Sequence, residues 1–215
     1  MICPASTSPG RRETDPTRSP RVRPGRRGYS LVEVLAAVTL LTIAAGAATA
    51  SLLPARDAVR TSGAARWLAA ELHRARMEAL KRHANVAVRF EPGGDDYRLV
   101  WYVDGNGNGV RTAEIDAATD VRLGPDSTLA HQFPGVRFGL ADGVTTLDGD
   151  DGTGEEPVRV GRSRMVSFSP VGSSTSGTVY LLGRGPRQYA VRVLGPTGRI
   201  RTLEFVFATR AWEPR

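Results

Sequence analysis

The sequence predicts an α+β protein in which one long N-terminal helix packs on a C-terminal antiparallel, β-rich globular domain. Two observations lead to this class. Residues 29–84 contain an apolar run followed by an amphipathic stretch with helical periodicity. After Asn85, short β-like runs alternate with glycine, proline and aspartate up to the end of the chain. Helices segregated from strands in this way are typical of α+β proteins.

The first element is an apolar run, Leu31 to Leu53, in which Glu33 is the only formally charged residue and which ends before Pro54. As a helix it is about 35 Å long, enough to cross a bilayer core of about 30 Å. A carboxylate in such a helix costs about 2.5 kcal/mol or more at the bilayer centre, so it is rarely present without a partner or a role. A simple membrane anchor accounts for the apolar run and leaves Glu33 and the preceding Gly28 unexplained.

Residues 1–28 differ in composition from the rest and are expected to be a cytoplasmic leader that is removed. They hold seven arginines against two acidic residues, so they carry a net +5 of the chain's +7. Residues 29–215 would then be only about +2, and the high pI says little about nucleic acid. Cys3 is the only cysteine. Without the leader there is no thiol for a disulfide or a cysteine metal site.

An amphipathic helix is expected next, within residues 54–84, with bends at Pro54 and Gly63. Its arginine- and glutamate-rich end, Arg74 to Arg82, is either a basic patch or simply the solvated side of the helix. The residues expected to be buried recur at helical spacing and are Leu68, Leu72, Ala75 and Ala79.

Residues 85–215 are expected to form one β-rich domain, with the acidic stretch Asp142 to Pro157 as a surface insertion. The predicted strands are Val86–Phe90, Tyr97–Val103, Val136–Leu140, Met165–Phe168, Thr178–Leu182, Tyr189–Leu194 and Ile200–Phe207.

The glycine-rich stretch from Asp104 to Gly109 opens like a calcium loop. Asp104, Asn106 and Asn108 offer oxygen ligands at alternate positions, and a glycine stands sixth. The closing glutamate is missing, because the twelfth residue is Ile115. The alternative is an ordinary Gly/Asn turn after the strand that ends at Val103.

Near the C-terminus, Arg199 and Arg201 would point to the same side of an extended strand, where two guanidinium groups can bind neighbouring phosphates. Arginines on the open face of a sheet are the plainer interpretation. The three histidines, His73, His83 and His131, show no metal-ligand spacing, and nothing resembles a catalytic motif. We therefore expect no enzyme activity, no cofactor and no metal other than the calcium candidate.

The stretch from Arg26 to Glu33 resembles the class III signal of type IV pilins and type II secretion pseudopilins. The resemblance implies that a prepilin peptidase cuts after Gly28, that Tyr29 becomes the N-methylated first residue, and that Glu33 is retained for assembly. Tyr29 departs from the family, which more often has Phe or Met there. In a helix bundle of low dielectric, Glu33 would pair with the charged amine of a neighbouring subunit.

The C-terminal half is similar to the GspH/FimT group of minor pseudopilins, on the stretches from Met165 to Val179, Tyr189 to Val193 and Thr197 to Arg201. The helix leading into the first strand, Leu68 to Phe90, is also similar. The resemblance implies a type IV pilin-like fold and a structural subunit of a type II secretion pseudopilus. By the same resemblance, the partners of the protein would be other major and minor pilins or pseudopilins. The protein would be a single-pass protein of the bacterial inner membrane with its C-terminal domain in the periplasm.

Two other functions remain open. FimT-like minor pilins that capture DNA in natural transformation carry a Gly-Arg-x-Arg motif, which Gly198 to Arg201 matches, so Arg199 and Arg201 are the possible DNA contacts. The other alternative is a membrane-tethered periplasmic binding module that never polymerises.

Overall fold

The computed structural model of the 215-residue chain describes residues 28–94, 96–150 and 156–215, and for residues 47–54 it describes the backbone alone. The expected leader therefore lies outside the described residues, apart from Gly28. The chain divides into two compact units, Met1–Gly46 and Ala47–Arg215.

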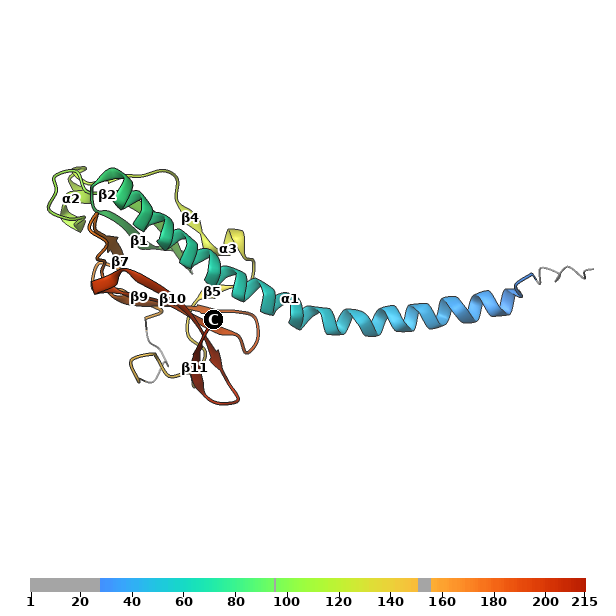
Figure 1. Ribbon diagram of the computed structural model, residues 1–215. Helices are drawn as coiled ribbons and strands as arrows, with labels where there is room; N and C mark the ends of the chain where they lie inside the picture. The colour runs from blue at the N-terminus through green and yellow to red at the C-terminus, as the bar shows by residue number, and fades with distance from the viewer. Residues whose placement is uncertain (1–27, 95, 151–155) are drawn as a thin grey trace, which may run out of the picture. The chain divides into compact units, whose positions relative to one another are not determined.

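Helix α1 spans Leu31–Arg82 and contributes to both units (Figure 1). It continues through Pro54 and Gly63, where bends were expected. In the second unit its four predicted core positions, Leu68, Leu72, Ala75 and Ala79, are fully buried. Lys81 and Arg82 lie in its last turn, where cations interact favourably with the helix dipole. His83, with a φ of 51°, ends the helix in the left-handed conformation typical of such termini.

All strand pairs in the described residues are antiparallel, and they form two sheets. The first sheet has the order β3-β2-β1-β7, with β4 also paired to β2. Its strands are β1 (Val86–Gly93), β2 (Asp96–Val103), β3 (Val121–Arg122), β4 (Ser127–Thr128) and β7 (Met165–Phe168). The short helix α2 (Thr112–Asp116) connects β2 to β3, and the short helix α3 (Leu129–Gln132) follows β4 and leads to the second sheet.

The second sheet has the order β11-β10-β9-β8-β5, with β6 also paired to β8. Its strands are β5 (Arg137–Phe138), β6 (Val158–Arg159), β8 (Gly177–Leu182), β9 (Gln188–Leu194), β10 (Arg199–Val206) and β11 (Ala211–Pro214). A single 3-10 turn, η1 (Gly195–Thr197), joins β9 to β10.

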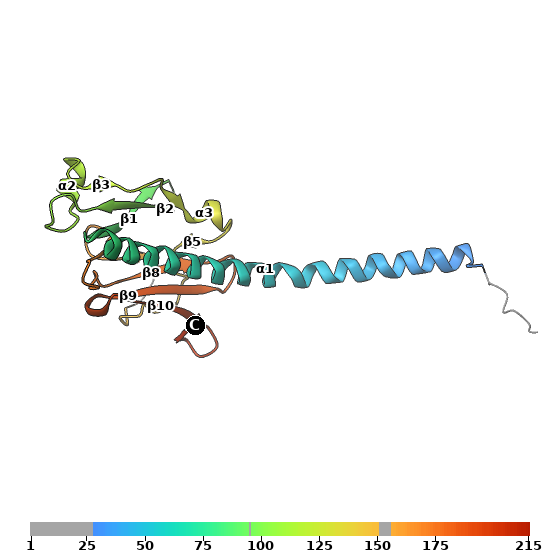
Figure 2. The ribbon, with the colours of Figure 1, turned by 45° about the horizontal axis from the view of Figure 1, so that its top comes forward.

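One core unites the second part of α1 with both sheets. Figure 2 shows β1 and β2 on one side of this part of the helix and β8, β9 and β10 on the other. Leu68 and Leu72 of α1 belong to the same buried cluster as Val88 of the first sheet and Val191 of the second. Neither sheet has to bury its inner face alone, because the helix supplies apolar surface to both.

The predicted strands correspond to the main strands of the structure, with Met165–Phe168 matching β7 at both ends. The predicted strand Val136–Leu140 is mostly wrong, because only Arg137–Phe138 pairs as β5. The short pieces β3, β4 and β6, the last strand β11 and the short helices were not predicted. Two-residue strands carry no alternation pattern, so their pairing depends on the neighbour rather than on the segment.

Acidic side chains of the insertion Asp142 to Pro157 form ion pairs with arginines from elsewhere in the chain. Asp148 pairs with Arg192 at 3.0 Å, and Glu156 forms two hydrogen bonds with Arg164 at 3.1 and 3.2 Å. The Tyr97 hydroxyl also donates to Glu156. Burial, followed by this bond to a carboxylate, raises the pKa of Tyr97 to about 12. These contacts hold both described ends of the insertion against the sheets.

Candidate functional site

The N-terminal segment from Gly28 to Glu33 leads into α1 through a short non-helical stretch. Gly28, Tyr29 and Ser30 precede the helix and are exposed, and Tyr29 keeps 82% of its surface accessible. The Ser30 hydroxyl accepts a hydrogen bond from the Val32 backbone N–H at 3.3 Å, and the Ser30 carbonyl accepts one from Val34 at 3.1 Å. Ser30 therefore acts as the helix N-cap.

Glu33 lies in the first turn of α1 and is exposed. A carboxylate at this position interacts favourably with the positive end of the helix dipole. The sequence Ser30 to Glu33 also has the S-x-x-E spacing of a capping box. Ser30 was not among the predicted site residues, although the capping pattern was readable in the sequence. A glutamate at position 33 is thus explained locally by stabilisation of the helix N-terminus, in addition to the role in assembly that the family resemblance implies.

The described part of the apolar run, Leu31 to Gly46, leaves its large side chains exposed. Eight aliphatic residues are at least half accessible in the structure: Leu31, Val32, Val34, Leu35, Val38, Leu40, Leu41 and Ile43. Two threonines satisfy their hydroxyls inside the helix, since Thr39 donates to the Leu35 carbonyl and Thr42 to the Thr39 carbonyl. Among the residues that the structure describes, no helix is both long and apolar enough to cross a membrane.

Arg199 and Arg201 lie on β10, and both are exposed. They point to the same side of the strand, as the sequence predicts for alternate residues. Arg201 is directly opposite Arg192 of β9, and Arg192 pairs with Asp148. Neither Arg199 nor Arg201 has an ion pair or side-chain hydrogen bond with another described residue. Cross-strand pairing therefore places Arg192 on the same face of the sheet as Arg199 and Arg201.

Gly198 sets the start of this strand. Its φ is 59°, a left-handed conformation, and a Cβ atom there would lie 2.6 Å from the Gly172 carbonyl oxygen. Its own carbonyl accepts a hydrogen bond from the Arg76 side chain of α1 at 3.2 Å. Only glycine fits this junction without strain. The glycine of the Gly-Arg-x-Arg stretch therefore has a structural explanation that is independent of any ligand.

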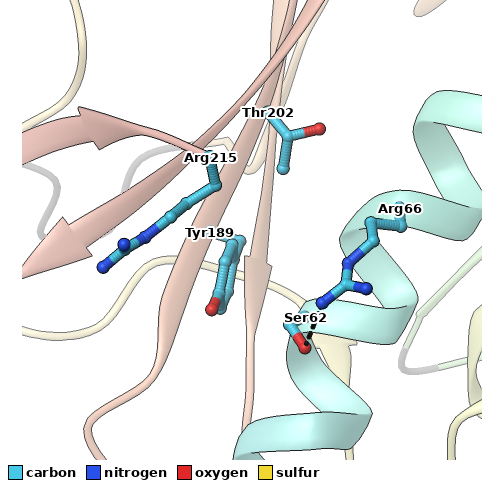
Figure 3. Close-up of a pocket in the computed structure, with 5 residues that line it drawn as sticks. All are labelled: Ser62, Arg66, Tyr189, Thr202 and Arg215. Carbon is cyan, nitrogen blue, oxygen red and sulfur yellow. Dashed lines mark hydrogen bonds between the residues drawn. The ribbon is translucent and has the colours of Figure 1, made fainter.

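Two hollows lie between α1 and β10. The smaller, of about 140 Å³, is lined by Ser62, Arg66, Tyr189, Thr202 and Arg215 (Figure 3). The larger, of about 460 Å³, shares Thr202 and Arg215 with it and is otherwise lined by Ala69, His73, Arg199, Ile200, Arg201 and Pro214.

These hollows are basic and contain little opposite charge. Among the described residues, the Arg66 side chain donates only to the Ser62 hydroxyl, at 3.4 Å, whereas Arg215 pairs with Glu204 at 2.7 Å. Neither Arg66 of the smaller hollow nor His73, which lines the larger hollow with Arg199 and Arg201, was predicted. They come from α1, more than 120 positions earlier in the chain, and no sequence pattern links two segments that meet only through packing.

The predicted calcium candidates lie in a loop in which acidic side chains accept hydrogen bonds from backbone and amide N–H groups, although the Glu114 Oε2 atom is buried without a hydrogen-bond partner among the described residues. Asp104 is buried and accepts four hydrogen bonds, from the backbone N–H groups of Asn106, Gly107 and Gly109 and from the Asn85 side chain. Burial alone would raise the pKa of Asp104, but these hydrogen bonds outweigh it, so the pKa lies below its ordinary value.

The rest of the loop is held in the same way. Asn106 and Asn108 both donate side-chain hydrogen bonds to Glu114, at 3.1 and 2.6 Å. Asp120 accepts hydrogen bonds from the backbone N–H groups of Gly105 and Arg111. Within the described residues, no cluster of three or more His, Cys, Asp or Glu side chains is suited to hold a metal ion. The loop geometry is that of a turn closed by acidic side chains.

Comparisons with known proteins point to one family. The family model described as Type II transport protein GspH matches residues 64–197. A second model, the Prokaryotic N-terminal methylation motif, matches residues 23–49.

Residues of this chain are 40% identical over 84 positions to Pilin-like protein PilA1 of Thermus thermophilus, over 39% of this chain and 51% of the relative. The chain thus spans about half the length of the curated relative it matches. Two structures of the minor pseudopilin EpsH from the Type 2 Secretion System of Vibrio cholerae align with 67% of this chain and with 97% and 94% of theirs. The identities are 15% and 16%, and both TM-scores are 0.41.

Proposed function

The chain belongs to the GspH family of type II transport proteins and carries a prokaryotic N-terminal methylation motif, and from this we propose that it is a minor pseudopilin of a type II secretion machine. The proposal depends on one observation: the methylation-motif match comes first along the chain and the GspH match follows it. The methylation motif covers the start of α1 as far as residue 49, and the GspH match covers α1 from residue 64 onward and the two sheets as far as η1. Its role is structural and it catalyses no reaction.

In this proposal, prepilin peptidase cleaves after Gly28 and Tyr29 becomes the methylated first residue. The exposed, non-helical stretch from Gly28 to Ser30 supports it, because a peptidase needs an accessible, extended backbone at the bond it cuts. We expect the apolar run Leu31 to Leu53 to anchor the chain in the inner membrane, although the described part of the helix is not long and apolar enough to cross a membrane by itself, and the β-rich domain to lie in the periplasm. Mass spectrometry of the mature N-terminus tests the processing. We expect a first residue of N-methylated Tyr29, and a chain that retains residues 1–28 in its own host would contradict it.

Glu33 then contributes to assembly by pairing with the amine of a neighbouring subunit. The exposed apolar side chains around it support a helix that is buried only in the company of other helices. We expect Glu33→Ala to be cleaved normally but to be absent from sheared or cross-linked filaments. Thr42→Ala, an exposed change on the same apolar stretch, is the matched control and should assemble. If Glu33→Ala assembles and secretes like the unaltered chain, the pairing role is wrong.

A second candidate function is DNA capture by a FimT-like minor pilin. It is favoured by one observation, namely that Arg199 and Arg201 are exposed on one side of β10 without a carboxylate partner among the described residues. Binding by such contacts weakens steeply as salt rises. An electrophoretic shift with duplex DNA at low salt should be lost in Arg199→Ala with Arg201→Ala. If the unaltered chain gives no shift at low salt, this candidate fails.

A further inference from the structure

The first half of β10 has a sheet partner on one side only. β10 pairs with β9 from Arg199 to Glu204, but its pairing with β11 covers only Leu203 to Val206. One further bond, from the Arg215 backbone N–H to the Thr202 carbonyl at 3.0 Å, extends that side. Among the described residues, the segment Arg199–Arg201 is therefore an open edge.

The hydrogen-bond register shows which backbone groups are free. Because the Thr202 carbonyl points away from β9, alternation along the strand directs the N–H and C=O of Ile200 to the same open side. The described residues provide no backbone partner for the Ile200 N–H and C=O or for the Thr202 N–H. Donors and an acceptor are thus presented in the pattern that a further strand requires.

The open edge faces space rather than a packed element. The hollow of about 460 Å³ beside it is lined on the helix side by Ala69 and His73 and on the sheet side by Arg199–Thr202. An added strand would lie about 4.8 Å from β10, inside this hollow. The three residues of the edge are about 10 Å long, enough to pair with a short extended segment.

The charges around the edge select what can pair with it. Arg199 and Arg201 are exposed and unpaired among the described residues, and His73 lines the same hollow. Charged side chains on edge strands normally prevent indiscriminate pairing with other strands. The same cations repel a basic segment and attract an acidic one. An edge that could otherwise pair with any strand therefore favours acidic strands.

We propose that the open edge of β10 docks an extended acidic segment of a neighbouring subunit by strand addition. The free Ile200 carbonyl favours a polypeptide over a nucleic acid, because a peptide offers N–H donors to it whereas a phosphate backbone offers acceptors only. The identification of the partner as a neighbouring subunit depends on the proposed assembly role. The capacity to bind an acidic strand does not.

The binding test uses the full chain in a neutral detergent and a fluorescent peptide of alternating glutamate and valine, followed by anisotropy. We expect saturable binding that weakens as salt rises, and no binding of the matching lysine-valine peptide. Arg199→Gln with Arg201→Gln should weaken binding by about tenfold or more at low salt. Arg162→Gln, an exposed arginine on another part of the domain, should leave it unchanged.

Ile200→Pro separates strand addition from simple charge attraction. Proline removes the N–H on the open side and leaves the β9 hydrogen bonds intact, because the Ile200 N–H points away from β9. We expect up to about tenfold weaker peptide binding, while Ile200→Val, which keeps the N–H, binds normally. A thermal melt checks that the variant folds. Independently of any variant, N-methylation of alternate peptide nitrogens should abolish binding to the unaltered chain.

Two results would overturn the inference. One is the absence of binding of the acidic peptide at low salt. The other is binding that persists in Ile200→Pro and with the N-methylated peptide, yet falls in the double arginine variant and is displaced by duplex DNA, which would assign the edge to nucleic acid. A chain that enters filaments but binds no peptide removes this inference alone. A chain that binds the peptide but never enters filaments removes the proposed function alone.

Discussion

At the scale of single residues, Gly198 combines a left-handed backbone with a close approach to Gly172. We expect Gly198→Ala to destabilise the fold by about 2 kcal/mol or more, from backbone strain and from the clash with the Gly172 carbonyl. Gly161→Ala is a matched control, because its φ of 57° is almost the same and nothing lies within 4 Å of the added carbon. Thermal unfolding measures both. Equal losses would show that strain alone accounts for Gly198.

Asp104 makes a prediction about pH. Its pKa is lowered in the folded state, so it stabilises the fold above its ordinary pKa near 3.8. That contribution is lost as the pH falls from about 3.8 through the lower folded value. Replacement by Ala leaves buried N–H groups unpaired and should cost about 1–3 kcal/mol at neutral pH. Urea unfolding at pH 7 and at pH 3 should show a smaller difference between Asp104→Ala and the unaltered chain at the lower pH. A difference independent of pH would contradict this account.

At the scale of elements, α1 meets β8 through a contact that requires a small residue. Thr61 is fully buried, and a Cβ added to Gly183, just after β8, would lie 2.2 Å from its hydroxyl oxygen. We expect Gly183→Ala to destabilise the domain by about 1–3 kcal/mol, because the helix must shift away from the sheet.

A double-mutant cycle tests that contact. Thr61→Ala removes the nearest atoms and should recover part of the loss in Gly183→Ala, which gives a coupling energy of at least about 0.5 kcal/mol. Gly139→Ala, where the nearest contact is an ordinary 3.6 Å, is the control and should be close to neutral. Additive losses in the cycle would mean that Thr61 and Gly183 do not constrain each other.

The elements also show where sequence reasoning succeeds. The buried face of α1 and the long strands β1, β2, β9 and β10 follow from periodicity, because each has enough residues to repeat its pattern. The short strands β3 and β6 do not, since a two-residue segment pairs only when a neighbour supplies the register.

At the scale of the whole molecule, the two sheets share one core through α1. Leu72 is fully buried in the cluster that contains side chains from both sheets. We expect Leu72→Ala to cost about 2–5 kcal/mol and to lower a single unfolding transition that is common to both sheets. Leu80→Ala, at a position that is 37% exposed on the same helix, should cost much less. Two separate transitions in thermal unfolding would show that the sheets are independently stable.

The sequence by itself determined the α+β class, the amphipathic face of α1 and the stretch from Gly28 to Glu33 that marks the family, because each depends on neighbours within a few positions. Tertiary structure alone decided the setting of Arg199 and Arg201. It placed them on an open sheet edge beside His73 of α1. It also gave the Asp104 loop hydrogen-bond partners as distant as Asn85 and Asp120. Such contacts join segments far apart in the chain, and their position follows from how the helix packs on the sheets rather than from any local pattern.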